Sequence, residues 1–213
     1  MSNAVIVLGG SFNPPTIAHK QILETVVKST RAQLGLFVPS SDAYVRRKMS
    51  RSHGIVFTER ERYEMCNALT LETDIPAAVS TLEYGDDGRG HTYDTLCRIQ
   101  TMYPGTKICL IVGEDKLGII PKWHNAEKLL EQFMLIITKR SNDSTDVYAK
   151  IDADRLLRRY AGNMTIVELE DDMTEISSTK ARGYIKSGRL DESRVLTDSV
   201  KQLIKAYGSR RAL

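Results

Sequence analysis

This sequence is poor in the residues that cross-link a chain or collect metal ions. Only three of its 213 residues are cysteine, and Cys66, Cys97 and Cys109 have neither an even count nor the spacing of a zinc site. That pattern argues against a disulfide framework and favours reduced thiols, as in the cytosol. Cys109 lies inside an apolar run, where we expect it to be buried as a small hydrophobic residue.

A strong charge imbalance and long apolar runs are missing as well. The 30 basic and 27 acidic residues leave a net charge of +3, which is too small to argue for a nucleic acid or a membrane as partner. No apolar stretch approaches the roughly 20 residues of a membrane span. The first apolar run also comes too early for a signal peptide. We therefore expect a soluble protein of the cytoplasm, or of the nucleus if its source is eukaryotic, that binds neither nucleic acid nor membrane.

Internal repeats and linker-like segments are also missing from the chain. A length of 213 residues, with 41% hydrophobic and 27% charged residues, is ordinary for a globular protein with one sizeable core. We predict a single domain over residues 1–213, in which residues 189–213 form a C-terminal helical end. The sequence leaves open whether the protein forms a homo-oligomer.

Short apolar runs alternate with segments of helical spacing along the chain. The expected strands are Ala4–Leu8, Leu34–Val38, Ala77–Leu82, Lys107–Val112, Phe133–Ile137 and Met164–Leu169. The expected helices are Ile17–Val27, Thr58–Leu71, Thr92–Met102, Asp152–Tyr160 and a segment that begins at Ser177 or Ser178 and ends at Gly188. The basic stretch 40–52 is poor in apolar residues and predicts a loop. This alternation predicts an α/β fold, a three-layer, doubly wound parallel sheet.

The first expected strand ends in a glycine turn that is typical of phosphate-binding sites. Residues 9–19 read GGSFNPPTIAH, and helical spacing follows at once. In such a turn the free amides and the positive end of the helix dipole face one point, which suits a phosphate. Pro14 and Pro15 are expected in the first helical turn. Thr16 and His19, three positions apart, are expected on one face of it.

Two later segments follow other expected strands and carry polar groups. Gly113 and Asp115 come after the fourth strand, where the glycine would let a sugar approach and the carboxylate could accept hydrogen bonds from ribose hydroxyls or simply cap a helix. Residues 176–182 read ISSTKAR before the last expected helix. There Thr179 and Arg182 share a face, and hydroxyls, amides and a guanidinium suit the outer phosphates of a nucleoside triphosphate.

Together these motifs resemble the nucleotidylyltransferase superfamily, and within it the nicotinamide/nicotinate mononucleotide adenylyltransferases. The commoner first motif ends in His-x-Gly-His, where this chain has Thr16 and Ala18 in place of the first histidine and the glycine. The pattern Gly-Ser-Phe-Asn-Pro-x-Thr-x-x-His resembles the eukaryotic branch, and ISSTKAR resembles the second signature of the family, Ile-Ser-Ser-Thr-x-x-Arg. The resemblance covers most of residues 4–188 and implies the Rossmann-like nucleotidylyltransferase fold.

The resemblance also implies which residues bind the substrates. ATP is expected at Gly9, Gly10, Ser11, Phe12, Thr16, His19, Gly113, Asp115, Ser177, Ser178, Thr179 and Arg182. The mononucleotide is expected at Ser11, Phe12, Arg46, Thr92, Thr95 and Trp123. His19 and Arg182 are the expected catalytic pair. Trp123 would stack on the pyridine ring, and the backbone of Thr92 would read the acid or amide group. Without the resemblance, Thr92 could equally be a helix cap and Trp123 a core residue.

The basic stretch 40–52 carries two resemblances of its own. Residues 39–44, PSSDAY, resemble a Pro-x-x-Asp-Ala-Tyr-Lys-Lys-Lys stretch of the eukaryotic adenylyltransferases, in which a lysine two positions after the tyrosine holds the mononucleotide phosphate; Arg46 matches it. Residues 48–52, KMSRS, resemble a loop of class I aminoacyl-tRNA synthetases. That loop follows the whole nucleotide-binding fold in the synthetases, whereas here it comes about thirty residues after His19. We therefore reject a synthetase, and a solvated surface remains the alternative from composition alone.

The implied reaction transfers AMP from ATP to the phosphate of nicotinamide or nicotinate mononucleotide and releases pyrophosphate. Because the acceptor is already an anion at neutral pH, we expect catalysis by alignment and charge neutralisation, with neither a general base nor a covalent nucleophile. Mg²⁺ is expected to arrive with ATP, since no carboxylate cluster would cage it and no metal site of the protein is predicted.

Three other activities stay open as alternatives. Two are transfers within the superfamily, from ATP to pantetheine phosphate and from CTP to a small alcohol phosphate. The third is a nucleotide sensor that binds without turnover. Within the favoured family, Thr16 and the Asp42-Ala43-Tyr44 stretch resemble the branch that accepts both mononucleotides. They predict efficiencies for the two within about tenfold.

Overall fold

The fold is described by a computed structural model that covers residues 3–50, 54–86, 90–140, 146–169 and 176–211. Its centre is a six-stranded sheet in the order β3-β2-β1-β4-β5-β6, and every neighbouring pair is parallel. The strands are β1 (Ala4–Gly10), β2 (Leu34–Pro39), β3 (Ala77–Val79), β4 (Lys107–Gly113), β5 (Met134–Arg140) and β6 (Met164–Leu169). The predicted doubly wound parallel sheet is confirmed.

The central strand shows why the apolar runs become a buried sheet. Along β1, Ile6 and Leu8 belong to one hydrophobic cluster, whereas Val5 and Val7 belong to a second one on the opposite face. Successive side chains of a strand point to opposite faces, so an unbroken apolar run fills two cores at once. Burial of this run on both faces places a layer of helices on each side of the sheet.

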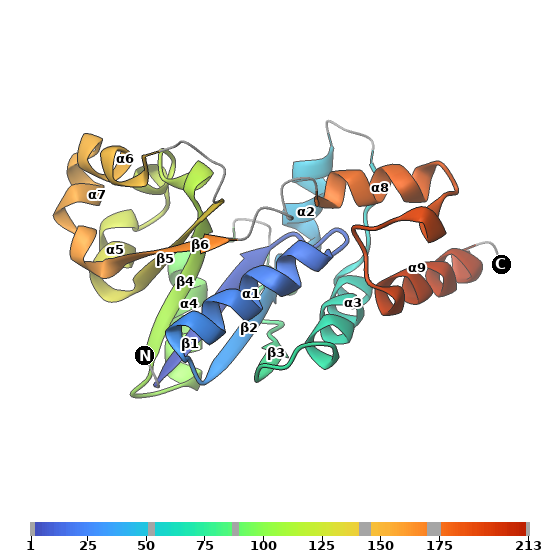
Figure 1. Ribbon diagram of the computed structural model, residues 1–213, viewed down its shortest axis with the longest axis horizontal. Helices are drawn as coiled ribbons and strands as arrows, with labels where there is room; N and C mark the ends of the chain where they lie inside the picture. Colours follow the sequence, from blue (N-terminus) through green and yellow to red (C-terminus); the bar gives the residue numbers. More distant parts are fainter. Residues whose placement is uncertain (1–2, 51–53, 87–89, 141–145, 170–175, 212–213) are drawn as a thin grey trace.

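The helices divide between the two clusters (Figure 1). The first cluster is covered by α1 (Ile17–Thr30), α3 (Glu59–Leu71), α8 (Ser178–Lys186) and α9 (Asp198–Arg211). The second is covered by α4 (Thr92–Met102), α5 (Ala126–Gln132), α6 (Val147–Ala153) and α7 (Arg155–Arg159). Short 3₁₀ turns complete the chain: η1 (Glu114–Lys116), η2 (Ile120–Lys122), η3 (Ala161–Asn163) and η5 (Leu190–Glu192). Within the described residues no helix is long and apolar enough to cross a membrane.

The basic stretch after β2 is a helix, α2 (Asp42–Met49), so the prediction of a loop over residues 40–52 was wrong for most of its length. The Ser41 hydroxyl caps it by accepting from the backbone N–H of Tyr44. Val45 and Met49, four positions apart, bury one face. Two buried residues in an otherwise charged segment give too weak a pattern for the sequence to reveal the helix. Residues 51–53 lie outside the described part of the chain.

Three other boundaries differ from the predictions. Helix α1 begins at Ile17 with Thr16 as its N-cap, so Pro14 and Pro15 precede the helix. The helix expected over residues 152–160 is divided between α6 and α7. Asp154 breaks it with an extended backbone, and its carboxylate accepts from the N–H groups of Leu156 and Leu157 to start α7. Strand β3 ends at Val79, which is shorter than predicted.

Several local predictions are confirmed. Helix α4 has the expected bounds. Helix α3 begins with the capping box that Thr58 and Glu61 suggested, because each side chain accepts a backbone N–H from the other residue. Ser177 is the N-cap of α8. All three cysteines are free, and Cys109 is fully buried.

The strand order decides where a ligand can sit. β1 and β4 are hydrogen-bonded neighbours at the middle of the sheet, and the chain turns away to opposite sides from them. In an open parallel sheet this is the point at which a crevice opens beyond the carboxyl ends of the strands. The segments after Gly10 and after Gly113 therefore border one site.

Candidate active site

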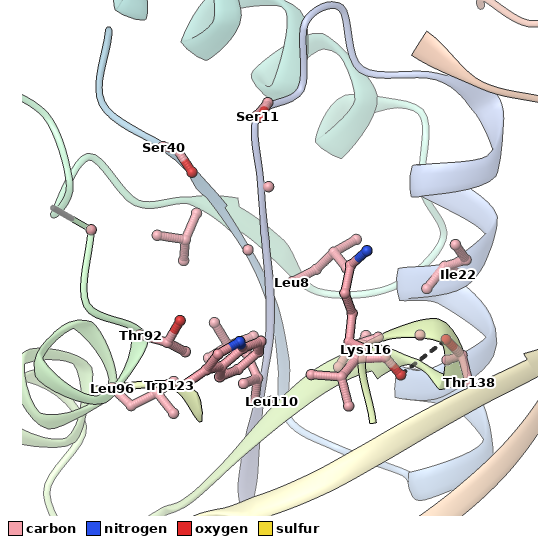
Figure 2. A pocket seen from close by; sticks show the side chains of 18 of the residues that line it. Leu8, Ser11, Ile22, Ser40, Thr92, Leu96, Leu110, Lys116, Trp123 and Thr138 are labelled. Carbon is pink, nitrogen blue, oxygen red and sulfur yellow. Dashed lines mark hydrogen bonds between the residues drawn. The ribbon is translucent and has the colours of Figure 1, made fainter. Parts of the chain in front are cut away.

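A cavity of about 680 Å³ opens at the carboxyl ends of β1 and β4. Strand β1 contributes its last residues, β4 its last residues with η1, and α2, α4 and the η2 segment close the other sides. Apart from aliphatic side chains, its lining consists of Gly9, Gly10, Ser11, Ser40, Tyr44, Lys48, Glu83, Gly90, Thr92, Gly113, Glu114, Asp115, Lys116, Trp123 and Thr138. Figure 2 shows Thr92 and Trp123 together on one side of the cavity, and Lys116 with Thr138 on the other.

His19 is held in one orientation by the start of its own helix. The backbone N–H of Thr16 donates to His19 Nδ1 at 2.9 Å, and the Thr16 hydroxyl lies 2.8 Å from the same nitrogen. Because Nδ1 accepts a backbone N–H, the ring proton resides on Nε2. Burial, with a smaller effect of the Lys48 charge, lowers the pKa of His19 to about 4. At neutral pH the side chain is therefore an uncharged donor through Nε2–H.

The glycine turn and Phe12 support this arrangement. Phe12 has a left-handed backbone (φ 43°), is 2% exposed and packs edge-on against the imidazole of His19, with ring centroids 5.0 Å apart. A side chain at Gly10 would meet the Phe12 ring at 3.2 Å, so this glycine makes room for the ring. Phe12 therefore orients His19, whereas Gly9, Gly10 and Ser11 line the cavity.

The second signature reaches the first through its side chains. Arg182 donates to the backbone carbonyl of Asn13 at 2.8 Å and to the hydroxyl of Thr179 at 3.0 Å. The Ser178 hydroxyl donates to the carbonyl of Pro14 at 2.8 Å. Ser177 is used as the cap of α8. The two signatures, more than 150 residues apart, are thus hydrogen-bonded to one another, and burial lowers the pKa of Arg182.

The segment after β4 carries a carboxylate, Asp115, and the amine of Lys116. Asp115 accepts from the Nζ of its neighbour Lys116 at 2.5 Å, and both side chains are at least half exposed. A side chain at Gly113 would lie 2.5 Å from the Asp115 carboxylate, so glycine is needed for Asp115 to take this position. The carboxylate is accessible at the sheet edge where the sequence predicted a ribose contact.

Arg46 is not among the residues that line the cavity; its side chain is 63% exposed and lies 4.0 Å from Asp42. The basic residue of α2 that does line the cavity is Lys48, whose Nζ donates to the Ser11 hydroxyl at 3.3 Å. Partial burial and the nearby charges of Lys116 and Arg182 lower the pKa of Lys48. Three cations from three elements therefore face one region, an arrangement that a polyanion would stabilise.

The opposite side of the cavity carries neutral donors, an aromatic ring and one carboxylate. Thr92 and Trp123 line it, as the sequence led us to expect for a pyridine ring. Thr95 is 6% exposed, and its hydroxyl donates to Glu83 at 3.0 Å. Glu83 itself lines the cavity, and burial raises the pKa of its carboxyl group. Thr95 thus serves to orient Glu83 and lies behind the cavity wall.

Sequence reasoning missed Lys48, Lys116, Glu83 and Arg62. Lys48 and Lys116 lie two residues and one residue beyond positions that the motifs had singled out. Arg62 had no signal, because its 0% exposure depends on distant partners. It donates to the carbonyl of Phe57, the carbonyl of Ser11 and the carboxylate of Asp42. Among the described residues, no cluster of three or more His, Cys, Asp or Glu side chains could hold a metal ion.

Comparison with known proteins finds one matching family and relatives that share one name. A family model described as cytidylyltransferase-like matches residues 7–183. A Fusobacterium nucleatum protein named "probable nicotinate-nucleotide adenylyltransferase" is 28% identical over 202 residues, which cover 94% of this chain and 96% of that protein. A Listeria monocytogenes protein of the same name is 27% identical over 207 residues, 97% of each chain.

Solved structures share the fold. Plasmodium falciparum nicotinic acid mononucleotide adenylyltransferase, complexed with APC, superimposes with a TM-score of 0.73 at 17% identity and covers 97% of this chain and 96% of its own. The same enzyme complexed with NaAD gives a TM-score of 0.70, again at 17% identity, with 96% of each chain covered. The two named sequence relatives are bacterial, so they lend no support to the predicted likeness to the eukaryotic branch.

Proposed function

This chain belongs to the cytidylyltransferase-like family, and on that premise we propose that it transfers AMP from ATP to a pyridine mononucleotide, forming the dinucleotide and pyrophosphate in NAD biosynthesis. The observation that carries the proposal is the polarity of the cavity. Its lining offers the Trp123 ring and Thr92 on one side, and Lys48 and Lys116 as cations elsewhere; His19 and Arg182 are not among the lining residues, but both lie near Lys48. The two substrates together have the same division, because the pyridine ring is aromatic and the phosphates of the mononucleotide and of ATP are anionic. The names of the relatives support this assignment.

The residues then have the following roles. A phosphate oxygen of the mononucleotide attacks the α-phosphorus of ATP, a new P–O bond forms, and the bond to the β-phosphate oxygen breaks to release pyrophosphate. Negative charge moves toward the leaving group, where preorganised donors lower the barrier. His19 donates through Nε2–H, and Arg182 supplies a guanidinium that Asn13 and Thr179 hold in place.

Lys48 and Lys116 extend this neutralisation into the cavity. No residue must remove a proton, because the attacking phosphate is already ionised at neutral pH. A neutral His19 is consistent with that, since it acts as a hydrogen-bond donor and has no proton to take up. The lysines and Arg182 are charged donors, and their hydrogen bonds would stabilise the negative charge that moves to the leaving group as the bond to the β-phosphate breaks.

A magnesium ion would enter with the ATP substrate. Asp115 and Glu114 line the cavity and are the carboxylates that would face it, and the described residues offer no cluster of three carboxylates that would hold it alone. The ion would supply neutralisation of phosphate charge, while the cations of the chain would act on the α-phosphate.

Asp115 would accept from the ribose hydroxyls of ATP, and the ring of the mononucleotide would lie against Trp123 beside Thr92. The sequence favoured Arg46 for the mononucleotide phosphate. We assign this contact to Lys48 instead, because Lys48 lines the cavity. Trp123 suits a cationic pyridinium ring, whose charge is attracted to an aromatic face.

The test is an assay of the purified protein with Mg²⁺, ATP and each pyridine mononucleotide, following pyrophosphate and the dinucleotide. Formation of both products supports the proposal. Matched reactions with CTP and a small alcohol phosphate, and with ATP and pantetheine phosphate, test the two other transferases. Binding of ATP without any product would instead identify a nucleotide sensor.

A further inference from the structure

Two histidine side chains stack on each other beside the cavity. The imidazoles of His91 and His124 are nearly parallel, with centroids 4.1 Å apart and an interplanar angle of 24°. His91 is the N-cap of α4, and His124 lies between η2 and α5. Two segments that are 33 positions apart in the chain are thus joined ring to ring. The centroid distance is a little shorter than the range of about 4.5–7 Å that is usual for aromatic pairs, so the two rings are in direct contact.

Each histidine is the direct neighbour of a residue that lines the cavity. His91 precedes Thr92, and His124 follows Trp123. The imidazoles are not themselves among the lining residues of the described chain, so they are placed to act on a ligand through their neighbours. Figure 2 shows the side chains of Thr92 and Trp123 next to each other on the same side of the cavity.

Backbone hydrogen bonds make each connection stiff. The carbonyl of His91 accepts from the N–H of Thr95 at 3.1 Å. The N–H of Trp123 donates to Ile120 at 2.9 Å, and its carbonyl accepts from Ala126 at 3.2 Å. His124 is further held by Asn125, whose amide nitrogen lies 2.9 Å from His124 Nε2. A displacement of either imidazole is therefore transmitted to Thr92 or to Trp123.

A second contact joins α4 to the far end of α5. Tyr93 packs edge-on against Phe133 with centroids 6.2 Å apart, and its hydroxyl donates to Gln132 at 3.2 Å. Helix α4 is thus held to α5 and to the segment before α5 at two places, of which the histidine stack is the one whose chain neighbours line the cavity.

We propose that the His91–His124 stack is a positioning element that holds Thr92 and Trp123 at the separation required by a planar aromatic ligand. The ligand class is a six-membered nitrogen heterocycle with a small polar substituent, so this inference rests on the proposed function. The stack contacts no substrate. It sets the affinity for the mononucleotide and leaves the binding of ATP unchanged.

Trp123 is the single tryptophan of the sequence and makes the test direct. Its fluorescence is titrated with the mononucleotide in the wild type, His91→Ala, His124→Ala and the double variant. Each single change should weaken mononucleotide binding between about twofold and tenfold. The double change should weaken it no more than one single change, because both singles remove one and the same contact. The KM for ATP should stay within about twofold of the wild-type value.

A conservative replacement distinguishes the loss of ring stacking from a general loss of local structure. The His91→Phe/His124→Phe variant keeps two flat rings and should restore most of the mononucleotide affinity. Tyr93→Phe is the matched control, since it removes the hydrogen bond to Gln132 from the same pair of helices and should leave the affinity unchanged. Thermal unfolding of each variant confirms that it is folded.

The outcomes distinguish this inference from the proposed function. Wild-type mononucleotide binding in the single variants would overturn it, as would effects that multiply in the double variant or an equal loss of ATP affinity. If the wild-type enzyme turns over in any of those cases, the proposed function stands. A wild-type protein that binds and turns over neither mononucleotide would overturn both.

Discussion

The backbone N–H of Thr16 donates to His19 Nδ1 at 2.9 Å, so the residue that caps α1 also determines the tautomer of the histidine. A threonine occupies the position at which the commoner family motif has a histidine. Here it serves the second histidine directly, through its backbone and its hydroxyl. The Nε2–H of a neutral imidazole therefore becomes the functional group of this turn, and the first predictions follow from it.

Replacement of His19 by alanine should lower kcat by two or more orders of magnitude, while the KM for ATP changes much less. The reason is that a preorganised donor stabilises the charge that develops in the transition state more than the bound ground state. Steady-state kinetics with ATP and the mononucleotide would measure both constants. Equal losses in affinity and in turnover would contradict this role.

Acid should weaken the native state through His19. Its pKa is about 4 in the folded protein against 6.5 for the free side chain, so the unfolded chain binds the proton first. The contribution of His19 to the free energy of unfolding is therefore complete above pH 6.5. It is lost as the pH falls from 6.5 toward 4, and the loss is no more than about 3 kcal/mol. Urea unfolding at several pH values would show a slope in this window that is smaller in His19→Gln. An identical slope in the variant would contradict the low pKa.

Lys48 and Arg46 lie on the same helix, two positions apart, and give a matched pair. Lys48→Ala should lower kcat/KM for the mononucleotide at least about tenfold, because a cavity cation is removed next to Ser11. Arg46→Ala should change it less than about twofold, since that side chain is 63% exposed. If the larger effect belongs to Arg46, the alignment of the basic stretch with the adenylyltransferase family is right and the role of Lys48 is wrong.

Arg62→Met should destabilise the protein by about 3 kcal/mol or more, because it removes the buried guanidinium that donates to the Asp42 carboxylate and to the carbonyls of Ser11 and Phe57. Arg60→Met is the control: Arg60 lies on the same helix and pairs with Glu64 at 2.9 Å, but its side chain is 84% exposed, so its loss should leave the unfolding midpoint almost unchanged. Denaturant unfolding measures both. Similar midpoints for the two variants would contradict the importance of the buried network.

The two pyridine mononucleotides should be used with efficiencies within about tenfold, a difference of about 1.4 kcal/mol in transition-state binding. Among the described residues, the cations that line the cavity are Lys48, which contacts Ser11, and Lys116, which Figure 2 shows apart from Thr92 and Trp123, whereas Glu83 is bonded to Thr95 on the helix that carries Thr92. Comparison of kcat/KM for the acid and the amide would measure the ratio. A thousandfold preference for the acid would contradict this prediction and agree with the names of the bacterial relatives.

The sequence by itself determined the sheet, the glycine turn and the two signatures. These are local properties: β1 is a continuous apolar run, and the spacing of Leu96 and Ile99 marks the buried face of α4. A capping pair such as Thr58 and Glu61 likewise depends on residues three positions apart. Such patterns can be recognised without knowing what packs against them.

Only the tertiary structure decided which cations face the cavity and which partners Arg62 finds. The side chains of Lys48 and Arg46 leave α2 in directions that differ by about 200° around the helix axis. Burial of Val45 and Met49 fixes that rotation and leaves Lys48 at the cavity. Arg62 bonds to Ser11 and Asp42 across 51 and 20 positions of the chain. The physical reason is the same in both cases: the phase of a helix and the partner of a buried charge are set by packing between distant segments, which no local pattern in the sequence records.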